Sequence, residues 1–250
     1  MADVVILIPG WNEAEEQMAV FASGRHGLPG LVDFGFRCEF FDGGRGNLRE
    51  RVDELAAFIS GLGSKQFALF GYSAGGLIAR GLLRAYPDAP ISAIFQLAAP
   101  NAGIVTDWPG VLFHQIHFDA SVISDMDVES DFITWLNTTS GYWQTDPATK
   151  KKRWVLRSTP WVAPAGMPIF NFIGRVPRYA DETDGIVRVE SAALCGAIPH
   201  GYIDGTNANH LNLGGTWNPL TFVLRGWSSD DRLWPQSVGA AARLFSVERP

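Results

Sequence analysis

The stretch "LFGYSAGGLIAR", residues 69–80, joins a hydrophobic run to a helix-like pattern through the motif GYSAG at 71–75. A G-x-S-x-G motif arises by chance about once in six sequences of this length and composition, so the motif alone decides little. Its setting is more informative, because 66–70 predicts a strand and 73–86 predicts a helix. A strand, this motif and a helix in that order are typical of a nucleophile elbow that exposes a serine hydroxyl, here that of Ser73.

The elements around this motif alternate between strand and helix. A helix is predicted at 48–62, with Asn47 as its N-cap and Gly61 as its stop. Further strands are predicted at 4–9, 37–41, 91–99 and 168–174. Such alternation favours a mostly parallel sheet with helices on both faces. We therefore expect an α/β fold that forms a single domain over residues 1–250.

The segment 103–164 breaks this alternation. It is irregular and holds five of the nine tryptophans, and its clearest helix is "SDFITWLN" at 130–137. We interpret it as a cap or lid insertion folded over the strand ends, where open α/β sheets bind ligands. Trp135 and Trp143 are its candidate substrate-binding residues. The alternative is that these aromatic side chains form only the core of the insertion itself.

A nucleophilic serine needs a histidine base and a carboxylate that orients it, in the chain order Ser, Asp or Glu, His for a sheet of this kind. Two of the five histidines follow the predicted strands, His200 in "IPHGYID" and His210 in "GTNANHLNLGG". The polar, glycine-rich loop makes His210 the preferred base, with His200 as the alternative. His26, His114 and His117 lie before the serine or inside the insertion.

The orienting carboxylate falls in the acidic loop "ADETDG", after the strand predicted at 168–174. Asp184 is preferred because it precedes Gly185 and the β-branched run "IVRV". The spacing alone leaves Asp181 and Glu182 as alternatives.

Five landmarks in order, "VVILIPGW", "GYSAGGLIAR", "LAAPNAG", "DGIVRVESA" and "NHLNL", resemble those of α/β-hydrolase lipases and esterases. The resemblance runs from residue 4 to about residue 215. It is greatest to bacterial triacylglycerol-lipase-like and PGAP1-like serine hydrolases. It implies a Ser73–Asp184–His210 triad on a compact α/β-hydrolase fold with about six core strands.

The same resemblance implies an oxyanion hole. Two N–H groups must face the developing alkoxide. One is expected from Ala74, which follows the nucleophile, and the other from Trp11, in the loop after the first strand. Pro9 stands where the family commonly has histidine, which leaves the backbone donor in place but changes how the loop is braced. The ligands of the calcium site found in some bacterial lipases cannot be matched to positions in this sequence. The triad chemistry needs no cofactor.

These residues favour hydrolysis of carboxylic esters, with an apolar acyl group, through an acyl-enzyme on Ser73. The substrate would be a small ester or lipid-like molecule. An acyltransferase or a thioesterase would use the same triad, and a catalytically silent binding relative is a further alternative. Oligomeric state is left open.

Composition and charge limit the kinds of binding partner and the cellular location that we expect. Hydrophobic residues make up 46% and charged residues 18% of the 250 residues, so a large core can form. The formal net charge of −6 argues against nucleic acid, and the basic run "KKKR" at 150–153 is interpreted as a solvated loop. The start does not resemble a signal peptide, and no apolar stretch is long enough to span a membrane, so a cytoplasmic location is expected. Cys38 and Cys195 are expected to be buried thiols, because a disulfide would need an oxidising compartment.

Overall fold

A parallel sheet organises the chain. The computed structural model describes residues 4–10, 15–24, 28–42, 46–63, 66–104, 120–150, 152–176, 182–204, 210 and 234–246. Six strands form one sheet in the order β2-β1-β3-β4-β7-β8, and every neighbouring pair is parallel. The strands are β1 (Val4–Ile8), β2 (Arg37–Phe40), β3 (Phe67–Tyr72), β4 (Ile91–Leu97), β7 (Ile169–Arg175) and β8 (His200–Asp204). The predicted α/β fold is therefore confirmed.

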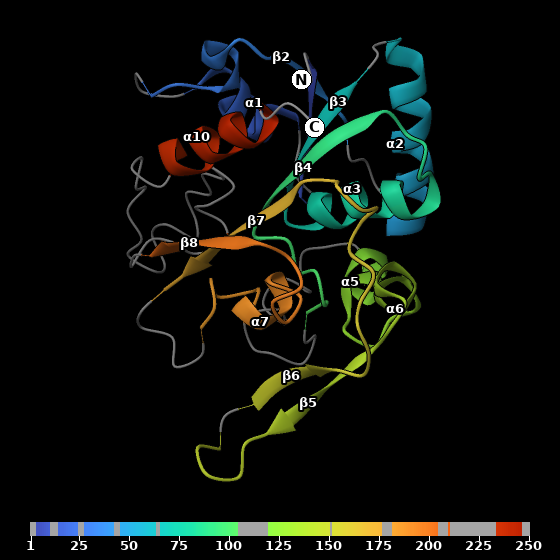
Figure 1. Cartoon of the computed structure of the whole chain (residues 1–250), viewed down its shortest axis with the longest axis vertical. Helices are drawn as coiled ribbons and strands as arrows, with labels where there is room; N and C mark the ends of the chain where they lie inside the picture. Colours follow the sequence, from blue (N-terminus) through green and yellow to red (C-terminus); the bar gives the residue numbers. More distant parts are fainter. Residues whose placement is uncertain are drawn as a thin grey trace.

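Helices cover both faces of the sheet, which explains why β1 is apolar throughout. Val4, Ile6 and Ile8 pack on one side with α2 (Leu48–Leu62) and α3 (Ala74–Ala85). Val5 and Leu7 pack on the other side. That second layer consists of α1 (Glu15–Ser23), the 3-10 helix η1 (Leu31–Phe34) and α10 (Trp234–Phe245) (Figure 1). Both faces of β1 are therefore covered by apolar side chains.

The ends of α2 test two local expectations. Asn47 is the N-cap as predicted, because its side chain accepts a hydrogen bond of 2.8 Å from the backbone N–H of Glu50. The predicted stop at Gly61 is wrong. The helix runs to Leu62 and closes at Gly63, which adopts a left-handed conformation with φ 65°. A glycine can remain helical at modest cost, so the residue that takes the left-handed position sets the end.

The chain between β4 and β7 contains regular structure that the sequence did not reveal. It forms α5 (Ala120–Met126), α6 (Asp131–Asn137) and an antiparallel hairpin of β5 (Gly141–Thr145) and β6 (Lys152–Leu156), with residues 105–119 outside the described part. The helix predicted at 130–137 is confirmed as α6. The segment is not irregular throughout, and "KKKR" is only partly a loop, because β6 begins at its third residue. Figure 1 shows the hairpin standing out from the rest of the molecule. Its role as a cap stays a prediction.

The two cysteines, the lengths of the helices and the grouping of possible metal ligands relate to the expected location and cofactors. Cys38 and Cys195 are free thiols, Cys38 partly buried and Cys195 exposed, so neither is the fully buried thiol that was expected. Among the described helices, none is long and apolar enough to cross a membrane. The described residues also bring together no group of three or more His, Cys, Asp or Glu side chains that could hold a metal ion.

Candidate active site

The turn between β3 and α3 holds Ser73 in a strained backbone conformation. Its φ is 50° and its ψ is −121°, a combination that residues with a side chain rarely adopt. The flanking glycines make this turn possible. A Cβ on Gly71 would lie 2.5 Å from the backbone oxygen of Gly75, and one on Gly75 would lie 2.3 Å from that of Ile8. Such strain costs about 1–3 kcal/mol and persists where the surrounding packing enforces it.

Three buried side chains form a continuous hydrogen-bonded chain at this turn. His210 Nε2 lies 2.8 Å from Ser73 Oγ, and His210 Nδ1 lies 2.7 Å from Asp184 Oδ2. Because an ionised carboxylate can only accept, the geometry favours a proton on Nδ1 and leaves Nε2 to accept from the Ser73 hydroxyl. This is the arrangement that a serine nucleophile and its base require.

The loop around Asp184 holds the carboxylate and the histidine together. Asp184 Oδ1 accepts hydrogen bonds from the backbone N–H groups of Ile186 (3.0 Å) and Val187 (2.7 Å). The backbone oxygen of Asp184 accepts from the N–H of His210 at 2.9 Å. Asp184 is only 1% exposed, so these donors replace the water that a carboxylate would otherwise bind. Asp184 therefore fixes His210 through both its side chain and its main chain.

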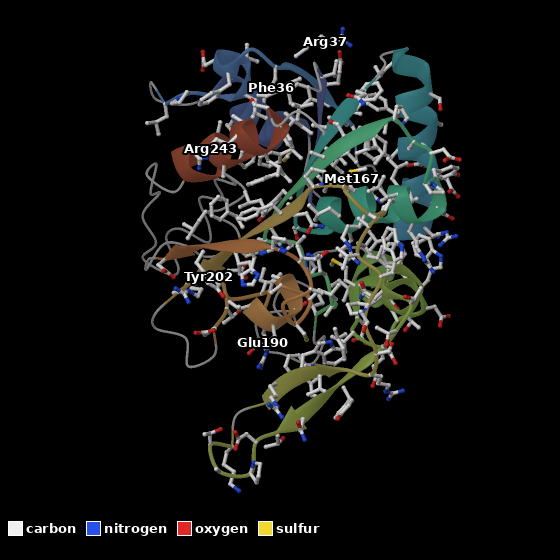
Figure 2. The ribbon with its side chains drawn as sticks, viewed as in Figure 1. Phe36, Arg37, Met167, Glu190, Tyr202 and Arg243 are labelled. Atoms are coloured by element: carbon white, nitrogen blue, oxygen red, sulfur yellow. The ribbon has the colours of Figure 1, made fainter. Side chains whose placement is uncertain are left out.

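Two of the alternatives that the sequence left open, His200 and Glu182, are described, and neither contacts the triad through its side chain. His200 sits on β8, where its ring contacts the oxygen of Ile198 (2.9 Å) and the hydroxyl of Tyr202 (3.0 Å). Figure 2 labels Tyr202 on that strand. Glu182 has a side chain 65% exposed and 3.9 Å from Arg175. Asp181, His26, His114 and His117 lie outside the described residues.

The structure describes one of the two predicted oxyanion-hole donors. Ala74 is the first residue of α3, a helix of 12 residues, whose first N–H groups have no acceptor within the helix. Trp11 lies outside the described residues. The chain just before Trp11 approaches the elbow closely, because a Cβ on Gly75 would lie 2.6 Å from the oxygen of Pro9. Both roles stay predictions.

Tyr72 is a contact of the histidine that the sequence did not single out. Its hydroxyl donates a 2.6 Å hydrogen bond to the backbone oxygen of His210, and its ring centroid lies 5.3 Å from the imidazole centroid. Tyr72 is 1% exposed and directly precedes Ser73. The main chain of His210 is thus held on one side by Asp184 and on the other by Tyr72.

Arg80 of α3 is a second buried group that the sequence did not indicate. Its guanidinium is fully buried and donates to the side-chain oxygens of Asn101 (3.0 Å) and Asn137 (2.8 Å) and to the backbone oxygen of Trp161 (2.7 Å). All three acceptors are uncharged. Burial lowers the pKa of Arg80 to about 9, which still leaves it charged at neutral pH.

The asparagine network extends from Arg80 toward the triad. Asn101 Nδ2 donates to Gln96 Oε1 (2.8 Å) and to the backbone oxygen of Ala192 (2.9 Å), in the short helix α7 (Val189–Ala192) that follows the Asp184 loop. Asn171 Nδ2 donates to the same oxygen of Ala192 at 2.9 Å. One buried polar network therefore links α3, α6 and α7. Within it, Arg80 Nε is buried without a hydrogen-bond partner among the described residues, so the network is not fully satisfied.

The two candidate substrate-binding tryptophans each stack against an arginine. The guanidinium of Arg49 lies 3.6 Å from the ring centroid of Trp135, on the α2 side of the insertion. Trp143 lies between Trp154, at a centroid distance of 5.2 Å, and the guanidinium of Arg188, at 4.5 Å. None of these contacts joins either tryptophan to the triad, so their substrate-binding role stays a prediction.

Comparisons with known proteins agree with this architecture. A family model described as palmitoyl protein thioesterase matches residues 42–159, which include Ser73 but neither Asp184 nor His210. A curated relative named lysosomal thioesterase PPT2 homolog, from Drosophila melanogaster, is 21% identical over 253 residues, covering 99% of this chain and 83% of the relative.

Two solved structures have similar folds at low sequence identity. The mature Bacillus licheniformis lipase BlEst2 has a TM-score of 0.59 at 14% identity, covering 89% of this chain and 91% of its own. The metagenomic carboxyl esterase MGS0156 has a TM-score of 0.58 at 15% identity, covering 98% of this chain and 76% of its own. Together with the parallel six-stranded sheet, these likenesses show that the chain has the α/β-hydrolase fold.

Proposed function

We propose that this protein is a serine acyl hydrolase that cleaves fatty acyl thioesters, with carboxylic esters as a second substrate class. The observation that carries the proposal is the chain of hydrogen bonds from Ser73 through His210 to Asp184. The match to a thioesterase family model across the elbow supports the thioester, and the lipase and esterase folds are compatible with the ester. A fold alone does not determine the substrate.

The reaction begins when His210 Nε2 accepts the proton of the Ser73 hydroxyl and Ser73 Oγ forms a bond to the acyl carbonyl carbon. Asp184 stabilises the imidazolium without itself taking the proton. The oxygen of the tetrahedral intermediate accepts hydrogen bonds from the backbone N–H groups of Ala74 and Trp11, which lower the barrier by stabilising its charge. The carbon–sulfur or carbon–oxygen bond then breaks, and His210 returns its proton to the departing thiol or alcohol.

Water completes the cycle. His210 takes a proton from a water molecule, the resulting hydroxide attacks the acyl group on Ser73, and the carboxylic acid leaves as Ser73 recovers its proton. A transferase would place an alcohol, amine or thiol in the position of that water. Product analysis with and without a competing acceptor therefore distinguishes a hydrolase from a transferase.

A pair of matched substrates tests the choice between thioester and ester. We expect a palmitoyl thioester of a small thiol to be cleaved with a kcat/KM about tenfold or more above that of the oxygen ester of the corresponding alcohol. A thiolate leaves with less help from a general acid than an alkoxide does. The measurement compares acid release from both substrates by the purified protein. A preference for the oxygen ester would make the protein an esterase on the same triad.

The contact between Tyr72 and His210 predicts a positioning effect. Changing Tyr72 to phenylalanine keeps the ring but leaves the buried carbonyl of His210 without its donor, which costs about 1–3 kcal/mol. We expect kcat to fall about tenfold with little change in KM, because the base shifts while the acyl group binds as before.

A matched variant separates this effect from the mere loss of a tyrosine hydroxyl. Tyr86 also donates one hydrogen bond, to Asp53 at 2.8 Å, but at the far end of α3 from Ser73. Tyr86→Phe should leave kcat unchanged. An equal kcat in Tyr72→Phe and the wild type would remove Tyr72 from the positioning of the base.

The cellular location of the protein is left open. The relative of this chain is named lysosomal, so the cytoplasmic location expected from the sequence stays a prediction. A lipid-like acyl substrate remains part of the proposal.

A further inference from the structure

The β5–β6 hairpin concentrates the lysines of this protein. The chain has four lysines, and three of them are consecutive at 150–152, followed by Arg153. Residues 141–157 contain five basic residues and a single acidic one, Asp146, in a chain of formal net charge −6. The hairpin therefore carries a local charge opposite in sign to that of the whole molecule.

The tip of the hairpin is a turn closed by Asp146, with two of the basic residues described as exposed beside it. Asp146 Oδ1 accepts hydrogen bonds from the N–H groups of Thr149 (3.0 Å) and Ala148 (2.8 Å), and these bonds lower the pKa of Asp146. Lys150 and Arg153 are both exposed. Lys151 lies outside the described residues, and of Lys152 only the backbone in β6 is described. The single negative charge of Asp146 offsets only part of the positive charge of the hairpin.

The base of the hairpin is attached next to the loop that carries Asp184. Arg188 lies four residues after Asp184 in the chain, and its guanidinium covers the ring of Trp143. The thiol of Cys195, in the turn after α7, contacts the backbone oxygen of Trp154 at 3.4 Å. The hairpin thus packs against the segment 188–195, which follows the Asp184 loop in the chain.

We propose that the tip of the β5–β6 hairpin docks the protein on a lipid surface that carries anionic headgroups. Lysine ammonium groups bind such surfaces as point charges, and each one near the surface strengthens binding about fivefold. The choice of a membrane as partner rests on the proposed function, because fatty acyl substrates collect in bilayers. Docking by the tip would hold the protein on the surface that carries these substrates.

The test is co-sedimentation of the whole protein with phosphatidylcholine vesicles, prepared with and without phosphatidylserine. We expect binding only to the vesicles with phosphatidylserine, and its loss when salt is raised, because exposed charges are screened. The double variant Lys150→Gln/Arg153→Gln should bind about 25-fold more weakly. The control is Arg37→Gln/Arg243→Gln, which removes the same charge from two sites far from the hairpin (Figure 2) and should bind as the wild type does.

Two further measurements separate this proposal from the proposed function. Ser73→Ala should still bind vesicles, and the hairpin variant should still cleave a soluble short-chain ester at the wild-type rate. Binding that is absent, that is equal on neutral vesicles, or that is weakened equally by the two double variants would overturn the docking role. None of these outcomes depends on whether Ser73 is the nucleophile.

Discussion

Replacing Ser73 with alanine should lower kcat by about 10⁴-fold or more and abolish labelling by a fluorophosphonate. The substitution removes only the hydroxyl group. Activity should be lost because the proposed reaction forms a covalent bond to the hydroxyl oxygen. Alanine keeps the Cβ, so the strained turn between Gly71 and Gly75 is unchanged. The variant should therefore melt within a few degrees of the wild type.

Ser92 offers a closely matched control. Ser73 and Ser92 are each 8% exposed, and the Ser92 hydroxyl donates to the backbone oxygen of Phe67 at 3.0 Å. Ser92→Ala removes the same atom from a buried serine on the neighbouring strand β4, so activity should stay near that of the wild type. If Ser73→Ala retained even a tenth of wild-type turnover, Ser73 could not be the nucleophile.

Replacing His210 with alanine should have an effect of similar size. The variant loses the acceptor for the Ser73 proton and leaves the carboxylate of Asp184 with one fewer donor. A serine without a base is a weak nucleophile, so both kcat and the rate of fluorophosphonate labelling should fall by about 10³-fold or more.

His200→Ala is the matching control, because His200 also makes two ring contacts but on β8, with Ile198 and Tyr202. We expect its turnover to stay within about threefold of the wild type, since surface changes away from a site have small effects. The reverse order of severity would make His200 the base and contradict the arrangement described above.

The two pairs of variants also distinguish catalysis from folding. The His210 ring bonds to both Ser73 and Asp184, so its removal breaks two buried hydrogen bonds and should lower the melting temperature more than removal of the Ser73 hydroxyl, which breaks one. Activity lost in both variants, with stability lost mainly in His210→Ala, is the expected pattern. Loss of activity in proportion to loss of stability would instead indicate a structural role for both residues.

Much of the fold could be predicted from the sequence because the signals are local. The β-branched run of β1 shows within a few residues that both faces are buried, and Asn47 caps α2 through a contact only three residues away. The elbow is local at Gly71, where a Cβ would meet Gly75 in the same turn, whereas a Cβ on Gly75 would meet Ile8 at the end of the distant strand β1. The errors arose at the end of α2, where Gly61 and Gly63 are both plausible stops, and in the hairpin, whose strands are short and carry polar and basic residues.

Only the tertiary structure decided which side chains meet at the site. The contact between His210 and Ser73 spans 137 residues, and the one between Arg80 and Asn137 spans 57. Asp184 and Glu182 are two residues apart in one acidic loop, yet one is buried against His210 and the other is exposed. The sequence by itself determined the order of strands and helices and the serine at the elbow, because hydrophobic period and glycine placement act over a few residues. The tertiary structure decided which carboxylate meets His210, that Tyr72 holds its main chain, and that Arg80 is buried. These features depend on which distant segments the sheet brings together, and a local sequence pattern does not encode those contacts.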